Sequence, residues 1–354
     1  MGALIPVRAD LGLFEGYHSP QVDVAVRLNT NESPFPPPTA WLRALHEALD
    51  TVAFHRYPDR SATALRQGIA QSHNVRPEQV FVANGSNEVL QTLLLTYGGP
   101  GRTAAVFEPT YALHSHIAKI TGTAVATGER GPDFTLDPAE VDRVLADAQP
   151  DLTFLCSPNN PTGRIEPPEL VRHTVDAAPG MVVVDEAYGQ FSRWSALELV
   201  DDDTALVVVR TFSKTWSMAA ARLGYCIAPA SVVNALEQVV LPYHLDTMKQ
   251  LAGTLALRFQ SEMEARVATI NEERGRIAAA FAALPVDTWP SDANFILFRP
   301  RGIDGRDVWK ALLERSVLVR DCTSWDRLDG CLRVTVGTPE ENDRFLDALR
   351  EVLA

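Results

Sequence analysis

Residues 152–163 have the sequence LTFLCSPNNPTG, and this stretch says most about the fold. Its first five positions are apolar except for one threonine, which is typical of a strand covered on both faces of a sheet. Two prolines and a glycine then constrain a loop that presents two asparagine amides. A plain connection seldom needs so much constraint. We therefore interpret Ser157–Gly163 as a preformed hydrogen-bonding site beyond the carboxyl end of a strand.

Short apolar runs of the same kind recur on both sides of this stretch. They are Val80–Ala83, Ala104–Phe107, Thr123–Ala126, Met181–Val184, Ala205–Arg210 and Gly224–Ala228. Amphipathic segments such as Asn87–Tyr97 and Pro138–Ala148 lie between them. Strands that alternate with helices predict a mostly parallel sheet between two layers of helices, which is the three-layer α/β class.

The pattern changes towards both ends of the chain. Residues 1–38 are irregular and rich in proline, and we interpret them as an arm that packs on the small domain or on a partner subunit. Residues 39–230 form the predicted large domain. Residues 231–354 form the predicted small α+β domain, in which a long helical segment through Glu262–Leu284 precedes short strands. The last helix opens with Thr338-Pro339-Glu340-Glu341, a capping box.

The composition excludes several classes of protein. The chain has 354 residues, of which 46% are hydrophobic, and a formal net charge of −13, as expected of a folded globular protein. An acidic chain is a poor partner for nucleic acid. We find no signal-peptide layout and no stretch near the roughly 18 apolar residues of a membrane span. The four cysteines lack metal-binding or redox spacing, so we expect reduced thiols, no metal site and a cytoplasmic location.

Polar residues follow the predicted strands, at the edge where open α/β sheets bind ligands. Gly85, Ser86 and Asn87 begin a helix directly after a strand, and such a helix start can seat a phosphate. An ordinary capping turn would explain the same residues. Tyr111 follows the next strand and either stacks on a planar ligand or is a half-buried core tyrosine.

The later strands end in charged residues. Asp185 closes an all-apolar run, so it is either part of a structural ion pair or the partner of a ligand cation. Thr211, Ser213 and Lys214 follow another strand, and Arg222 lies eight residues beyond the lysine. A lysine there can be a nucleophile, and hydroxyls beside an arginine suit a phosphate, although a surface lysine beside a capping serine explains the tetrapeptide alone. Together these residues fit pyridoxal phosphate, which is planar, phosphorylated, cationic at its ring nitrogen and reactive towards amines.

At these residues the chain resembles the fold-type-I pyridoxal-phosphate enzymes of the class I/II aminotransferase superfamily, and more narrowly the histidinol-phosphate aminotransferases. The matching motifs, in family order over nearly the whole chain, are Leu28–Glu32, Arg56–Asp59, Asn84–Glu88, Ser157–Gly163, Val183–Tyr188, Thr211–Lys214, Arg222–Gly224, Asn294–Phe295 and Leu332–Thr338. The resemblance implies a seven-stranded sheet in the large domain. Thr215–Ala221 departs from relatives, which commonly have a phenylalanine and a glycine there.

The resemblance also implies roles for individual residues. Lys214 would bind the cofactor covalently and move the substrate proton, Asp185 would keep the ring nitrogen protonated, and Tyr188 with Asn160 would hydrogen-bond the ring hydroxyl. Tyr111 would stack on the ring. Tyr57 would reach the phosphate in the neighbouring subunit, which predicts a homodimer with shared active sites. The residues of the same chain that would form the phosphate site are Gly85, Ser86, Asn87, Thr211, Ser213 and Arg222.

The implied substrates are histidinol phosphate and the pair glutamate and 2-oxoglutarate. Arg333 would bind a carboxylate, and Arg320 would be a second anion-binding arginine, so that two guanidinium groups serve both substrates. Asn31 would line the entrance, and Tyr17 would close over the substrate from the partner chain. For Arg320 and Tyr17, a surface or packing role is the alternative. Rival functions are an aromatic aminotransferase, a threonine-phosphate decarboxylase and a non-catalytic ligand sensor.

Overall fold

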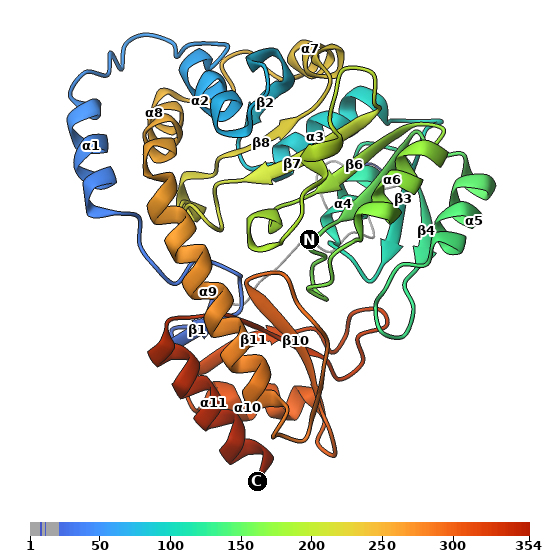
Figure 1. The fold of residues 1–354 in the computed structure, drawn as a ribbon, viewed down its shortest axis with the longest axis vertical. Coiled ribbons are helices and arrows are strands. Elements are labelled where there is room, and N and C mark those ends of the chain that lie inside the picture. The colour runs from blue at the N-terminus through green and yellow to red at the C-terminus, as the bar shows by residue number, and fades with distance from the viewer. Residues whose placement is uncertain (1–7, 9–10, 12–20) are drawn as a thin grey trace, which may run out of the picture.

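The computed structural model describes residues 8, 11 and 21–354. A seven-stranded sheet lies at the centre of the upper part of the molecule (Figure 1). Its strand order is β2-β8-β7-β6-β5-β3-β4, and all neighbours are parallel except β8, which runs antiparallel to β2 and β7. The strands are β2 (Val80–Ala83), β3 (Thr103–Glu108), β4 (Ala124–Glu129), β5 (Leu152–Cys156), β6 (Met181–Asp185), β7 (Leu206–Thr211) and β8 (Gly224–Ile227).

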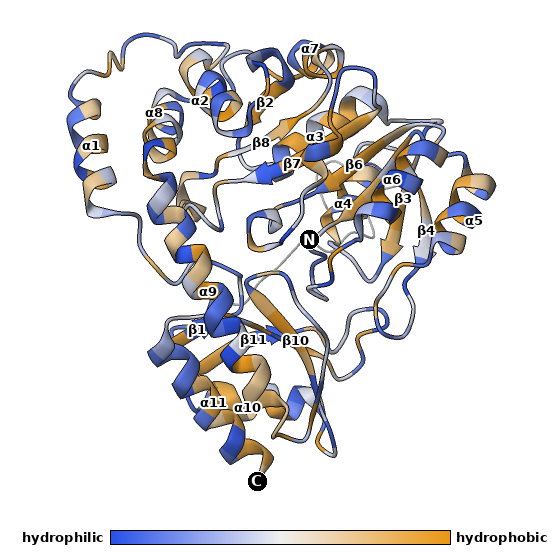
Figure 2. Cartoon of the chain, in the orientation of Figure 1, coloured by the Kyte–Doolittle hydropathy of each residue, from blue (hydrophilic) through white to orange (hydrophobic). Residues whose placement is uncertain are grey.

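Helices cover both faces of this large sheet, because its central strands are apolar at almost every position. The helices are α1 (Thr39–Leu49), α2 (Thr63–His73), α3 (Ser86–Tyr97), α4 (Leu113–Ile120), α5 (Pro138–Ala148), α6 (Pro168–Ala177), α7 (Ala230–Val239) and α8 (Thr247–Ala256). One face packs on α3, α4 and α7, and the other packs on α5 and α6 and, further along, on α2 and α8. Figure 2 shows hydrophobic strands between helices with hydrophilic outer sides.

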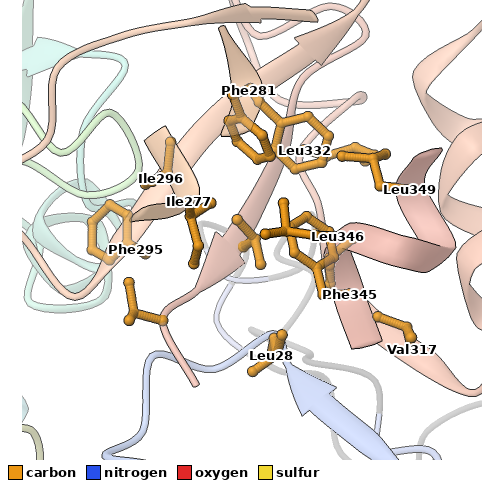
Figure 3. Close-up of a cluster of buried hydrophobic side chains, with 14 of the residues drawn as sticks. Leu28, Ile277, Phe281, Phe295, Ile296, Val317, Leu332, Phe345, Leu346 and Leu349 are labelled. Carbon is orange, nitrogen blue, oxygen red and sulfur yellow. The ribbon is translucent and has the colours of Figure 1, made fainter. Parts of the chain in front are cut away.

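A smaller five-stranded sheet lies below, in the order β1-β11-β12-β10-β9. Its strands are β1 (Val26–Leu28), β9 (Val286–Thr288), β10 (Phe295–Pro300), β11 (Val317–Asp321) and β12 (Leu332–Thr335). The long helix α9 (Gln260–Phe281) leads down from the large sheet, and α10 (Gly305–Glu314) and α11 (Pro339–Leu353) complete this part. Side chains of α9 and α11 pack against the small sheet, with Phe281 and Phe345 beside Leu332 (Figure 3).

The three-layer α/β fold with a mostly parallel seven-stranded sheet confirms the expectation from the sequence. The capping box at the last helix is also confirmed, since Thr338 and Glu341 exchange side-chain and backbone hydrogen bonds. All four cysteines are free and buried, as expected. One difference is β1, a strand inside the segment expected to be an irregular arm, which pairs in parallel with β11. Its three residues are too few to produce a periodic pattern.

Two properties of the described part of the chain bear on function. No helix there is both long enough and apolar enough to cross a membrane. Within the same residues, no group of three or more histidine, cysteine, aspartate or glutamate side chains is placed to hold a metal ion.

Candidate active site

A cavity opens at the carboxyl ends of β5, β6 and β7, and its empty space, counted together with the part open to solvent, is about 760 Å³. This is the edge at which an open α/β sheet offers its loops to a ligand. The cavity also receives residues from the segment after β1 and from β12 of the small sheet. The residues expected from the sequence that line it are Asn31, Ser86, Asn87, Tyr111, Asn160, Asp185, Tyr188, Thr211, Ser213, Lys214, Arg222 and Arg333.

Lys214 projects into the cavity from the loop after β7. Its Nζ donates a hydrogen bond to the backbone oxygen of Thr30 at 3.0 Å. Removal from water by the surrounding protein, reinforced by the positive charge of Arg333, lowers the pKa of Lys214 to about 7. A lysine with such a pKa has a substantial share, about half at pH 7, in the neutral, nucleophilic amine form.

Asp185 ends β6 in the same cavity and is only 1% exposed. The Nε2 atom of His114 lies 3.0 Å from Oδ2 of Asp185, and the backbone N–H of Ala187 donates to Oδ1 at 3.0 Å. His114 is stacked on Phe154 with ring centroids 5.0 Å apart. Its Nδ1 atom is buried and has no hydrogen-bond partner among the described residues. This arrangement fits an imidazole whose Nε2–H donates a hydrogen bond to the Asp185 carboxylate.

Sequence reasoning missed His114 because it lies within a helix and not at the end of a strand. One signal was available, since His114 follows Tyr111 by three residues and therefore lies on the same side of a helical turn. The ring of His114 also meets the edge of Tyr111, with centroids 5.4 Å apart. The buried partner of Asp185 is thus an imidazole, held between two aromatic rings.

Tyr188 and Asn160 are fixed by residues from the small sheet and from the segment after β1. Asn31 donates a hydrogen bond to the Tyr188 hydroxyl at 2.9 Å, and burial raises the pKa of Tyr188 well above its usual value. An Nη1–H group of Arg333 donates a hydrogen bond to the side-chain oxygen of Asn160, and an Nη2–H group donates to the backbone oxygen of Asn29 at 3.0 Å. The Arg333 guanidinium also lies over the Phe295 ring, 5.0 Å from its centroid.

The start of α3 lies very close to the end of β8 and to the Arg222 side chain. Gly85 precedes the helix with φ +83°, and a Cβ there would lie 2.7 Å from Nη2 of Arg222. A Cβ on Gly224 would lie 2.3 Å from the backbone nitrogen of Ser86. Both glycines therefore allow the strand end, the helix start and the Arg222 guanidinium to meet.

Hydroxyl donors complete this corner of the cavity. Arg222 donates to the Ser213 hydroxyl at 3.2 Å, and the hydroxyls of Thr211 and Ser213 are 3.0 Å apart. The hydroxyl of Tyr111 donates to the side-chain oxygen of Asn87 at 3.2 Å, which anchors the tyrosine at the same helix start. A helix N-terminus, a guanidinium group and several hydroxyls in one corner form a strong site for an anion such as a phosphate.

Three further residues line the cavity without having been expected: Thr30, Cys156 and Ala187. The backbone oxygen of Thr30 accepts the hydrogen bond from Lys214 Nζ. Cys156 lies opposite Asp185 in the pairing of β5 with β6, and burial raises the pKa of its thiol well above the ordinary value, so the thiol stays protonated. A backbone acceptor leaves no trace in the sequence, and Cys156 was assigned to the core.

Of the expected residues that the structure describes, three do not line the cavity: Gly85, Tyr57 and Arg320. Tyr57 is 80% exposed and stacks on Tyr243, with ring centroids 4.5 Å apart. Arg320 is buried on β11, directly opposite Arg333 on β12, and its guanidinium lies 5.2 Å from the centroid of Trp325. Tyr17 lies outside the described residues.

The described residues of the departing segment Thr215–Ala221 do not line the cavity. Trp216 packs against Phe212, with ring centroids 5.5 Å apart, inside the hydrophobic cluster beneath the lysine loop. Ser217 has φ +58°, a backbone conformation that favours glycine. Neither residue is among the described residues that line the cavity.

The chain is similar to known proteins over nearly its whole length. The family model for aminotransferase class I and II matches residues 23–349. The histidinol-phosphate aminotransferases of Streptomyces avermitilis and Frankia casuarinae are each 46% identical to this chain. The first alignment covers 98% of this chain and 96% of the relative, and the second covers 99% and 90%.

Solved structures share the fold. The histidinol-phosphate aminotransferase of Sinorhizobium meliloti, in complex with pyridoxal-5'-phosphate, has a TM-score of 0.85 at 24% identity, over 93% of this chain and 91% of that chain. The histidinol-phosphate aminotransferase of Clostridium acetobutylicum has a TM-score of 0.86 at 21% identity, over 92% and 98%. With a family model matched over most of its length and full-length relatives above 40% identity, the chain belongs to the class I and II aminotransferases.

Proposed function

We propose that the protein uses pyridoxal phosphate to transfer the amino group between L-histidinol phosphate and 2-oxoglutarate, giving imidazole-acetol phosphate and L-glutamate, as in histidine biosynthesis. The observation that carries this proposal is that one cavity contains Lys214, Asp185 and the anion site at the start of α3. The full-length relatives named histidinol-phosphate aminotransferase support the choice of substrate.

The residues present fit pyridoxal phosphate in charge and in hydrogen-bonding type. Ser86, Asn87, Ser213 and Arg222 would hold the phosphate, because they supply donors and a positive charge at a helix N-terminus. Asp185 would face the ring nitrogen, since a buried carboxylate favours a protonated partner. When bound, this cofactor supplies the electron sink that transamination requires.

The side chains around the cavity have separable tasks. Lys214 would hold the cofactor and then move a proton at the substrate Cα, for which an amine with a pKa of about 7 is suited. His114 would orient Asp185 by donating a hydrogen bond to its carboxylate. Tyr188 and Asn160, each fixed by a hydrogen bond to a neighbour, would orient the cofactor ring.

Two arginines would bind the anionic ends of the substrates. Arg320 and Arg333 are direct partners across β11 and β12 and therefore belong to the same face of the small sheet. Like charges placed opposite each other destabilise a sheet, and an anionic ligand would offset that cost. Histidinol phosphate brings a phosphate, and glutamate brings two carboxylates. We assign Arg333 to the carboxylate, with Arg320 as the second anion-binding residue.

We also propose a homodimer in which Tyr57 of each chain completes the phosphate site of the other. Tyr57 is exposed in the single chain, as are Phe54, Leu241 and Tyr243, all of which are large apolar or aromatic residues. The stack of Tyr57 on Tyr243 brings the two exposed segments together. Exposed aromatic residues of this kind commonly mark a protein interface. The cytoplasmic location stays a prediction.

Coupled turnover assays test this function. Glutamate with imidazole-acetol phosphate should support rapid amino transfer, whereas glutamate with phenylpyruvate should be used poorly. Preferential use of phenylpyruvate would instead establish an aromatic aminotransferase. Release of carbon dioxide from threonine phosphate would indicate the decarboxylase, and absence of any turnover by protein loaded with cofactor would favour a ligand sensor.

A further inference from the structure

The segment Asn29–Phe35, here called the strap, follows β1 and crosses from the small sheet towards α1 (Figure 1). Three consecutive strap residues touch the residues assigned to cofactor and substrate. The backbone oxygen of Asn29 accepts from Arg333, and that of Thr30 accepts from Lys214, both at 3.0 Å. Thr30 and the next residue, Asn31, also line the cavity. The position of the strap therefore sets part of the shape of the active site.

The strap is anchored on the small-sheet side through backbone groups of Asn31. Its N–H donates to the hydroxyl of Thr335 at 3.0 Å, and its oxygen accepts from the side chain of Asn294 at 3.1 Å. On the large-sheet side, the hydrogen bond to Lys214 changes whenever the lysine amine is engaged elsewhere. A lasting attachment on that side needs a residue that takes no part in binding or chemistry.

Ser217 has these properties. It lies three residues after Lys214, and its hydroxyl donates to the hydroxyl of Ser33 at 2.9 Å. The Ser33 hydroxyl in turn donates to the backbone oxygen of Phe35 at 3.2 Å and faces the N–H of Phe35 at 3.3 Å. The Ser217 hydroxyl, the Ser33 hydroxyl and the Phe35 N–H therefore each donate to an acceptor within this network. The contact links the lysine loop to the outer end of the strap, just before Pro36.

The backbone of Ser217 argues against an accidental contact. Its φ of +58° lies in the left-handed region, where glycine is the favoured residue and a side chain is strained. A serine there brings no packing advantage in the core, because it is only partly buried. What the serine adds over glycine at this position is a hydroxyl that hydrogen-bonds to Ser33.

We propose that Ser217 and Ser33 form a latch that holds the strap on the lysine loop and so positions Thr30 and Asn31 at the cavity wall. Ser217 and Ser33 are positioning residues, since neither is among the described residues that line the cavity. Only the kinetic consequence of the latch rests on the proposed function. The latch itself is a property of the protein without substrate.

Hydrogen exchange of the purified protein with bound cofactor tests the latch directly. Ser217→Gly, Ser217→Ala and Ser33→Ala should each speed exchange of the Asn31 and Phe35 amides by about 5- to 10-fold, the equivalent of one lost hydrogen bond. Ser217→Gly should do so without lowering the melting temperature, because glycine suits the backbone at this position. A purely structural role would instead make faster exchange and lower stability appear together.

The controls separate the latch from general loosening. Asn74→Gly places glycine at another left-handed position, φ +54°, at the end of α2, and should leave exchange in the strap unchanged. At the Asn31 amide, the double variant Ser33→Ala with Ser217→Ala should exchange no faster than either single variant, because both remove the hydrogen bond between Ser217 and Ser33. The Phe35 amide is not used for this comparison, because Ser33→Ala also removes the hydroxyl that this amide faces. Unchanged exchange in the single variants, or additive effects in the double variant, would overturn the latch.

Steady-state kinetics supply a second measurement. Loosening the strap should raise KM about 3- to 10-fold, in line with one lost hydrogen bond, while kcat stays within about twofold, because no chemical group is removed. A fall in kcat with KM unchanged would contradict a positioning role. If histidinol phosphate proves not to be a substrate, the exchange measurement still decides on the latch, so the two failures are distinguishable.

Discussion

His114→Phe removes the imidazole donor to Asp185 and leaves an aromatic ring stacked on Phe154. In the native protein the Asp185 carboxylate has two donors, His114 Nε2 and the backbone N–H of Ala187. The variant leaves Oδ2 without its buried donor. A hydrogen bond to a charged group contributes about 1.5–3 kcal/mol, which corresponds to roughly 10- to 100-fold in a rate constant. We expect amino transfer from glutamate to slow by this factor, because without the His114 donor the Asp185 carboxylate is held less firmly towards a protonated ring nitrogen.

The assay is a stopped-flow measurement of the half-reaction with glutamate, on protein saturated with cofactor. His173→Phe is the matched control, because His173 forms a comparable pair with Asp142 at 2.7 Å, but on the surface. An exposed ion pair contributes about 0–1 kcal/mol to stability, so the rate of amino transfer by this variant should stay within a few fold of the wild-type rate. His114→Gln keeps an N–H donor and should recover part of the rate. A rate for His114→Phe within twofold of wild type would refute the role given to His114.

Three other predictions concern the lysine, the helix start and the dimer. Because the folded-state pKa of Lys214 is depressed to about 7, the unfolded chain binds more protons between pH 7 and the ordinary lysine pKa near 10.5. Cofactor-free protein should therefore gain stability from this group as pH rises through that window, and urea titrations of Lys214→Met should lack the gain. Gly85→Ala forces a Cβ to within 2.7 Å of Arg222 at a positive φ, and equilibrium titration should show about 10- to 100-fold weaker cofactor binding. Mixing inactive Lys214→Ala with impaired Tyr57→Phe chains should restore activity if sites are shared, whereas no recovery after confirmed subunit exchange would count against the proposed dimer.

Much of the large sheet was predictable because its strands are buried on both faces. Leu152–Cys156 and its neighbours are apolar at almost every position, so their length and their flanking polar residues locate them. The direction of β8 was not predictable, since an apolar run looks the same in either orientation. β1 was missed because three residues carry too little pattern, and its pairing with β11 is a contact across most of the chain.

The candidate site was predictable where it depends on side chains that follow strands. Asp185 and Lys214 are conspicuous because charged residues at the ends of apolar strands are costly unless they have a partner. His114 was not found, since a histidine on an amphipathic helix has many ordinary explanations. The Thr30 oxygen could not be found at all, because backbone acceptors are the same in every residue.

The central claim is that the amine of Lys214 holds a pyridine-ring cofactor in the cavity that also contains Asp185. Reduction of the purified, cofactor-loaded protein with borohydride fixes the bond between cofactor and amine, and peptide mass mapping then identifies the lysine. The chain has four lysines, Lys119, Lys214, Lys249 and Lys310, so the assignment is unambiguous. We predict a single modified peptide containing Lys214. Modification at any of the other three lysines, or no modification of protein that binds the cofactor, would contradict the account.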